Sequence, residues 1–137
     1  MRAYILGGMI LAAVLLAGGQ TAAHHSFAAE FDRDKPIKLT GVVTKIEWTN
    51  PHVWFYINVK DEKTGEVANW GAEMGPPHGL QRQGWRRDTL KIGEEVSVEG
   101  SLAKNGTKRM NARTVLITAT GQKPRELDAV SSQGRTP

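Results

Sequence analysis

The chain has 137 residues, with 18 Lys and Arg, 14 Asp and Glu, four His and no Cys. This length is typical of a single domain, and the lack of Cys excludes a fold held together by disulfide bonds. The formal charge of +4 at neutral pH is a mild bias, which excludes a strongly polybasic protein.

The first 23 residues have the pattern of a secretory signal peptide. Arg2 precedes an uncharged apolar run over residues 3–17, and small residues follow as far as Ala23. The run is too short to span a bilayer well and no second run follows, which favours a cleaved signal over a retained anchor. Cleavage after Ala23 would remove Arg2, lower the formal charge by one and start the mature chain at His24. We therefore expect a periplasmic or secreted protein without a transmembrane segment after processing.

Residues 24–36 are expected to form an N-terminal arm and residues 37–119 the folded domain. The first strand is predicted over residues 37–48. Its apolar residues change parity next to Gly41, with Ile37 and Leu39 on one side and Val42, Ile46 and Trp48 on the other. Such a phase change is typical of a bulge or a sharp bend in a long strand.

The clearest strand pattern lies over residues 53–59, directly after the turn Asn50-Pro51. Apolar residues at odd positions alternate there with Trp54, Tyr56 and Asn58, as in a half-buried strand. The polar turn over residues 61–65 ends in Gly65, where a positive φ is expected. A third strand is predicted over residues 66–74, with its apolar residues in phase.

Gly75-Pro76-Pro77 ends the third strand, and residues 78–85 are expected to form a short helix. A fourth strand is predicted around residues 96–100, and Asn105-Gly106 predicts a hairpin turn. A fifth strand follows over about residues 110–119. Residues 120–137 lack periodicity and are rich in Ser, Gly, Pro, Gln and charge, so we expect a disordered tail.

This order of elements predicts an all-β protein. Five to six strands, the first long and bent, with a short helical insert between the third and fourth, are typical of a small OB-like barrel. A β-sandwich or an SH3-like barrel is the alternative.

Several short segments of this chain resemble a known family of small exported bacterial proteins. The similarity lies in Asn50-Pro51-His52-Val53, in residues 70–77, in Arg82-Gln83-Gly84-Trp85 and in residues 90–96, together with the start His24-His25-Ser26-Phe27. The family is known only as a domain of unknown function. The resemblance implies export and a compact β domain, and it carries over no catalytic residues.

The four histidines suggest a metal site. If the mature chain starts at His24, its amine and imidazole can chelate one metal ion, because an N-terminal amine has a pKa of about 8. This arrangement resembles the copper-binding histidine brace of certain exported proteins. Candidate ligands are His24, His25, His52 and His78, with Met74 as a soft ligand. The alternative is that these histidines lie in a solvated terminus, a turn and a loop, with no metal bound.

The aromatic residues suggest a ligand platform, because strands two and three of OB barrels commonly bind ligands. Trp54 and Tyr56 share one face of the predicted second strand. Candidate ligand-binding residues are Asn50, Trp54, Tyr56 and Trp70. The alternative is that Trp54 and Tyr56 are covered by the arm through Phe27 and Phe31.

Two other function classes have little support. The basic residues alternate with Asp and Glu, and an exported protein rarely meets nucleic acid, so we expect no nucleic-acid partner. We find no Cys nucleophile, no phosphate-binding Gly-rich loop and no His-Glu-x-x-His motif, so an enzyme is the less favoured class. We expect a periplasmic module that binds a small molecule, an envelope component or a protein partner, and alternatively a copper-binding protein. Its site should lie where the mature N-terminus meets residues 50–56 and 73–78.

Overall fold

The computed structural model describes residues 27–118 and 123–129. Within these residues the chain is mostly β, as predicted. The strands are β1 (Phe31–Glu47), β2 (Trp54–Lys60), β3 (Val67–Glu73), β4 (Glu95–Ala103), β5 (Arg109–Ile117) and β6 (Arg125–Asp128). Two short helices are described, α2 (Phe27–Glu30) and α3 (Pro77–Arg82). Over the described ranges, no helix is long and apolar enough to cross a membrane.

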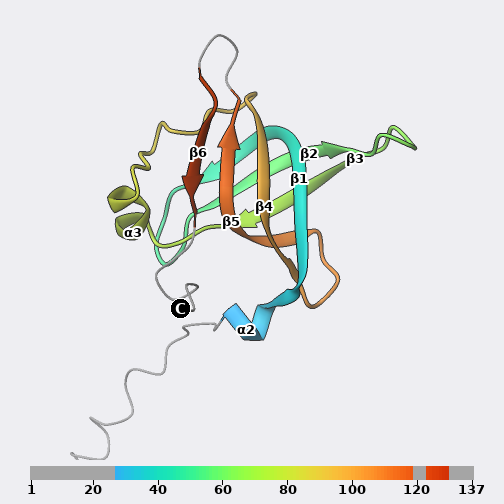
Figure 1. Ribbon diagram of the computed structural model, residues 1–137, viewed down its shortest axis with the longest axis horizontal. Coiled ribbons are helices and arrows are strands. Elements are labelled where there is room, and N and C mark those ends of the chain that lie inside the picture. The colour runs from blue at the N-terminus through green and yellow to red at the C-terminus, as the bar shows by residue number, and fades with distance from the viewer. Residues whose placement is uncertain (1–26, 119–122, 130–137) are drawn as a thin grey trace, which may run out of the picture.

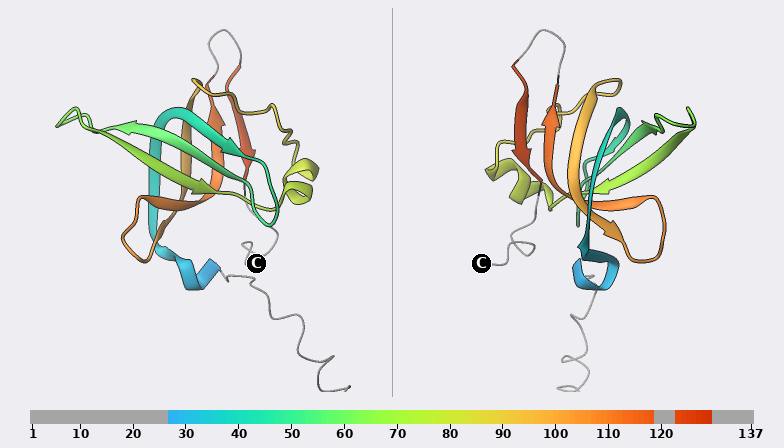
Figure 2. Two further views of the ribbon diagram at one scale, coloured as in Figure 1. Left: turned by 180° about the vertical axis from the view of Figure 1, so that it is seen from behind. Right: turned by 45° about the vertical axis from the view of Figure 1, so that its right-hand side comes forward.

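The strands form one sheet that closes into a barrel (Figure 1). Their order is β3-β2-β1-β4-β5-β6, and a parallel pairing of β3 with β5 closes the ring. The other pairings are antiparallel. The predicted OB-like barrel is confirmed. The long strand β1 pairs with both β2 and β4, the pairing of β3 with β5 closes the sheet, and α3 lies between β3 and β4 in the chain. Figure 2 shows α2 at one end of the barrel and the β2–β3 hairpin projecting away from it.

β1 bends so that one strand serves two neighbours. Its first part pairs with β4 and its last part with β2, and the register with β2 shifts between Val43 and Lys45. Val43 is buried whereas Val42 is 40% exposed. The predicted phase change is therefore confirmed, but it lies beyond Val43, and placing Val42 with Ile46 and Trp48 was wrong. Gly41 allows β1 and β2 to approach closely, because an added Cβ would lie 2.5 Å from the Asn58 carbonyl oxygen.

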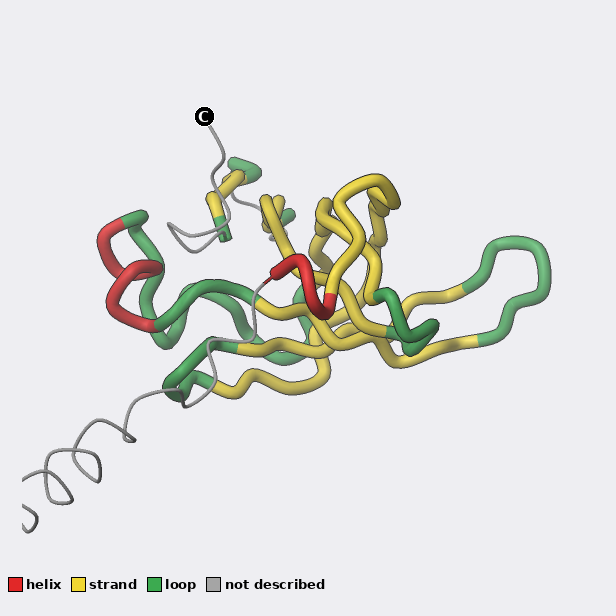
Figure 3. The backbone as a smooth tube through the Cα atoms, turned by 90° about the horizontal axis from the view of Figure 1, so that it is seen from below, coloured by secondary structure: helices red, strands yellow, loops and turns green. Residues whose placement is uncertain are grey.

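The core fills the barrel with side chains from every long strand and from the insert. Trp85, Phe55, Ile57 and Leu80 are among the largest fully buried residues. Phe55 and Ile57 belong to the odd-numbered face of β2, as the alternation predicts. Seen from below, α3 lies to one side of the strands (Figure 3). Burying these side chains is the main stabilising contribution of a chain without disulfide bonds.

Two predicted boundaries differ from the structure. β1 begins at Phe31, inside the expected arm, because Phe31 pairs with Ala103 and its side chain is buried. The tail is not wholly disordered, because β6 pairs with β5 and Ala129 is buried. Four residues are too few to show a strand period, so only the pairing reveals β6. The rest of the tail lies outside the described residues.

The predicted turns and insert are close to those observed. Gly65 and Gly106 both adopt φ of +75°, the left-handed region that glycine tolerates. α3 begins at Pro77 and ends at Arg82, slightly earlier than predicted, because Pro suits the first helical turn and Gly84 has a positive φ.

Candidate functional site

The outer face of β2 and β3 carries the aromatic pair predicted from the sequence. The register sets Trp54 opposite Glu73 and Tyr56 opposite Gly71. A Cβ on Gly71 would lie 3.3 Å from the Tyr56 ring and 3.6 Å from the Trp54 ring. The two rings therefore pack over a glycine that leaves them room, on the face that does not enter the core.

Each ring has a cation beside it. The Arg109 guanidinium carbon lies 4.4 Å from the centroid of the Trp54 ring, and the Lys45 ammonium lies 5.2 Å from that of Tyr56. Arg109 reaches Trp54 because β3 pairs with β5, which sets Gly71 beside Arg109. The Tyr56 hydroxyl donates a 3.0 Å hydrogen bond to Glu47. Both rings are half-buried, so the face combines apolar surface with positive charge.

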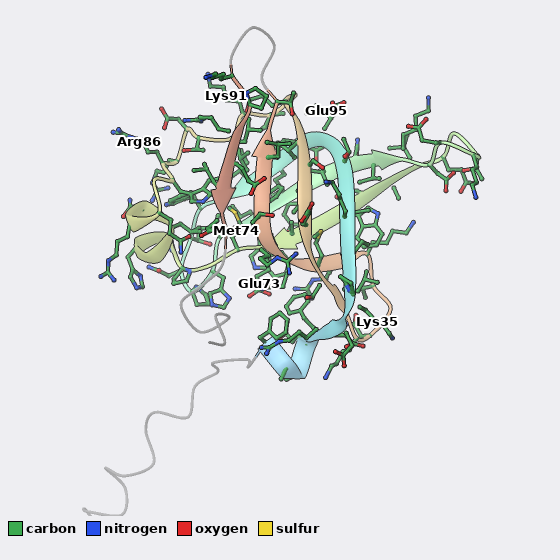
Figure 4. All side chains as sticks on the ribbon, viewed as in Figure 1. Lys35, Glu73, Met74, Arg86, Lys91 and Glu95 are labelled. Atoms are coloured by element: carbon green, nitrogen blue, oxygen red, sulfur yellow. The ribbon has the colours of Figure 1, made fainter. Side chains whose placement is uncertain are left out.

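His52 and Glu73 form a hydrogen-bonded pair at the end of this face, where β2 begins and β3 ends. Nδ1 of His52 bonds Oε1 of Glu73. Glu73 is only 7% exposed, the one charged residue buried within the described chain. Figure 4 labels Glu73, which lies on the side of β3 nearer to α2. We call His52, Trp54, Glu73 and Arg109 the rim site.

The Glu73 carboxyl is unusual in two respects. Burial raises its pKa above the ordinary value, while the His52 hydrogen bond and the Arg109 charge oppose this rise. Its second oxygen, Oε2, is buried and has no hydrogen-bond partner in the described structure. A buried acceptor without a partner costs about 1–3 kcal/mol of stability. Proteins retain a polar group that lowers their stability mainly where that group has a function, so we interpret the Glu73 carboxyl as a binding group.

The His52 imidazole is oriented by this pair. When Glu73 is ionised it accepts a hydrogen bond from the Nδ1–H group of His52, and in that tautomer Nε2 carries the free lone pair. Metal-binding histidines are commonly held in this way by a carboxylate on the other ring nitrogen. The same arrangement can accept a hydrogen bond from an uncharged ligand.

The structure separates the residues predicted to bind metal. His24 and His25 lie outside the described residues. His52 belongs to the rim site, His78 is exposed in α3, and Met74 is buried in the core with 2% exposure. No group of three or more His, Cys, Asp and Glu side chains gathers within residues 27–118 and 123–129. The described residues thus offer His52 as one oriented ligand and not a complete metal site.

The residues predicted to bind a ligand are also divided. Trp54 and Tyr56 share the outer face, and Asn50 is exposed in the turn before His52. The Asn50–Pro51 peptide bond is cis. Trp70 pairs with Ile57, so it lies on the inner face and packs against the core. The structure therefore groups Trp54 and Tyr56 with each other and not with Trp70.

Sequence reasoning placed the site beside residues 73–78 but did not identify the roles of Glu73 and Arg109. It did not pair Glu73 with His52, although the register of β2 with β3 brings Glu73 opposite Trp54. Arg109 appeared only as one basic residue among several. Its position depends on the parallel closure of β3 with β5, for which no local sequence signal exists.

The chain was compared with protein families, curated proteins and solved structures. No curated protein and no solved structure matches it. The family DUF6152, described as a family of unknown function, matches residues 12–112. This range covers most of the chain and includes every residue of the rim site. The chain therefore belongs to the DUF6152 family.

Proposed function

We propose that this protein is a periplasmic binding module whose ligand contacts the rim site. The observation that carries the proposal is the Glu73 carboxyl, buried against His52 with one oxygen that has no hydrogen-bond partner among the described residues. The export pattern of residues 1–23 supports the compartment. The position of the site, on the β2–β3 face of an OB-like barrel, agrees with where such barrels commonly bind ligands.

The chemistry of the rim site favours a small polar ligand or an envelope component with a flat or charged part. Trp54 offers a ring edge and Arg109 offers N–H donors. The exposed part of His52 offers a further polar contact, since 30% of its side chain is accessible. These groups come from two segments, the start of β2 and the start of β5, that only the closed barrel brings together.

The proposal predicts that simple chemical probes will map to one face. Amide chemical shifts of the ¹⁵N-labelled chain starting at His24 would be followed during titration with glucose, indole, acetate and methyl phosphate. We expect at least one probe to shift amides within residues 52–56, 71–74 and 109–111 in a saturable manner. Trp54→Leu should weaken that binding about tenfold, because base- or ring-stacking contacts are worth roughly 1–3 kcal/mol.

The matched control is Ile92→Ala, since Ile92 is 70% exposed in a loop before β4. It should leave the titration unchanged. Shifts scattered over the whole surface, or no saturable shift with any of the four probes, would count against a binding site at the rim.

A second candidate function is copper binding, and the His52 hydrogen bond specifically favours it. Nδ1 of His52 is engaged by Glu73, which leaves Nε2 to bind a metal ion. α2 starts at Phe27, three residues after His24, and its Glu30 acts electrostatically on Glu73. Three residues span at most about 11 Å, and the copper candidate requires the amine of His24 to reach His52 within that span. An amine and two imidazoles would form a nitrogen-rich set suited to Cu(II).

Calorimetry with Cu(II) tests this candidate. We expect the chain starting at His24 to bind Cu(II) more tightly than the same chain with its N-terminus acetylated, because acetylation removes the chelating amine. His52→Ala should weaken binding about tenfold or more, and the matched control His78→Ala should change it little. Equal and weak binding by all four proteins would eliminate the copper function.

A further inference from the structure

A cavity of about 240 Å³ lies next to the rim site, between α2 and the turn that joins β4 to β5. Both elements lie at the same end of the barrel in Figures 1 and 2. Glu30 and Phe31 line one side, and Lys104, Asn105 and Arg109 line the other. Arg109 therefore belongs both to this cavity and to the rim site.

Arg109 is the most distinctive residue of the cavity. No carboxylate of the described chain lies within ion-pair distance of its guanidinium, whereas Arg113 on the same strand lies 3.7 Å from Glu99. Contact with the Trp54 ring holds the guanidinium by one face and leaves its N–H edges to other partners. A planar guanidinium held in this manner is suited to two parallel hydrogen bonds with a carboxylate or a phosphate.

The β4–β5 turn adds donors to the same wall. The Lys104 ammonium donates a 2.6 Å hydrogen bond to the Ala28 carbonyl oxygen, which anchors its charge at the cavity. The Asn105 side-chain oxygen accepts bonds from the Thr107 amide and hydroxyl groups. Because the oxygen is engaged by Thr107, the amide nitrogen of Asn105 remains as a donor.

The charge of the lining is positive. Among the described residues that line it, Lys104 and Arg109 contribute two positive charges and Glu30 contributes one negative charge. A water molecule occupies about 30 Å³ in the liquid, so the cavity has room for a small group rather than for a drug-sized ligand.

We propose that this cavity binds an oxyanion, a carboxylate or phosphate group of the ligand, and that Arg109 is its main contact. This proposal rests on the proposed binding function, because it assigns one end of the ligand at the rim site. The ligand is thus anionic at the end near Lys104 and Arg109, while its remaining part contacts Trp54 and His52. The Trp54 ring does not contact the anion in this arrangement. It orients the Arg109 guanidinium, which binds the anion.

The test compares acetate and methyl phosphate as probes, with sodium chloride added to hold the ionic strength constant. Amide shifts of the ¹⁵N-labelled chain starting at His24 are recorded for the unchanged protein and for three variants. We expect saturable shifts at residues 29–31, 103–105 and 109. Arg109→Lys should weaken binding about tenfold, because it keeps the charge but loses the planar fork. The matched control Arg113→Lys, on the same strand, should stay within about twofold, because Arg113 does not line the cavity.

The two probes separate the sources of the anion, since tighter acetate binding indicates a carboxylate and tighter methyl phosphate binding a phosphate. Arg109→Gln, which removes the charge, should weaken binding at least as much as Arg109→Lys. Equal effects of the Arg109 and Arg113 variants, or no shift beyond that caused by chloride, would overturn the oxyanion site. If glucose or indole still shifts the rim residues in that case, the binding function stands and only its anionic part fails.

Discussion

Gly100→Ala is expected to destabilise the barrel by about 3 kcal/mol, close to the upper range of overpacking. Gly100 lies in β4 where the register with β5 shifts. An added Cβ would lie 1.9 Å from the carbonyl oxygen of Asn111, which is backbone and cannot rotate away. The strands would have to separate, and Asn111 also pairs with Glu73 of the rim site. Urea unfolding followed by tryptophan fluorescence measures the loss.

Gly79→Ala is the matched control for this prediction. Gly79 lies in α3, and the nearest heavy atom to an added Cβ is a ring carbon of Pro76 at 3.5 Å, an ordinary contact. Alanine is preferred to glycine within a helix by about 1 kcal/mol, so the change should not destabilise the protein. A loss in Gly100→Ala no larger than in Gly79→Ala would show that β4 and β5 do not approach as closely as described.

Trp85→Ala is expected to cost about 4 kcal/mol, as for other large aromatic side chains in a core. Trp85 is 1% exposed, and it follows α3 at the point where the chain turns back to the barrel. Its indole nitrogen donates a 2.7 Å hydrogen bond to the Asp128 carbonyl oxygen at the end of β6. One side chain thus fills the core and holds the last strand in place. The same urea unfolding measurement applies.

Trp85→Phe separates the two contributions. Phe keeps most of the buried surface but cannot donate to Asp128, so the expected loss is about 1–3 kcal/mol. Amide hydrogen exchange should rise first in β6, because its pairing with β5 spans only residues 125–128. The control is Trp70→Phe, at a partly buried position on the inner face. If amide exchange in β6 is unchanged in Trp85→Phe, the hydrogen bond from Trp85 to Asp128 does not hold the last strand in place.

The elements of this fold were predictable where local patterns are strong. The alternation in residues 53–59 identified β2 and its buried face, and Gly65 and Gly106 identified turns through their positive φ. The bend of β1 was also predicted, but its position was wrong. Both Val42 and Val43 suit a strand, and only the register with β2 decides that Val43 is the buried one.

The sequence by itself determined the all-β class and the family, because periodicity, turn residues and short motifs are local properties of the chain. It also identified His52, Trp54 and Tyr56 as candidates, because these residues stand together in one stretch. Only the tertiary structure decided which residues join them. Glu73 meets His52, and Arg109 meets Trp54, through strand pairings that close the barrel. Such contacts join residues far apart in the chain, and their geometry depends on the register of the whole sheet rather than on any local pattern.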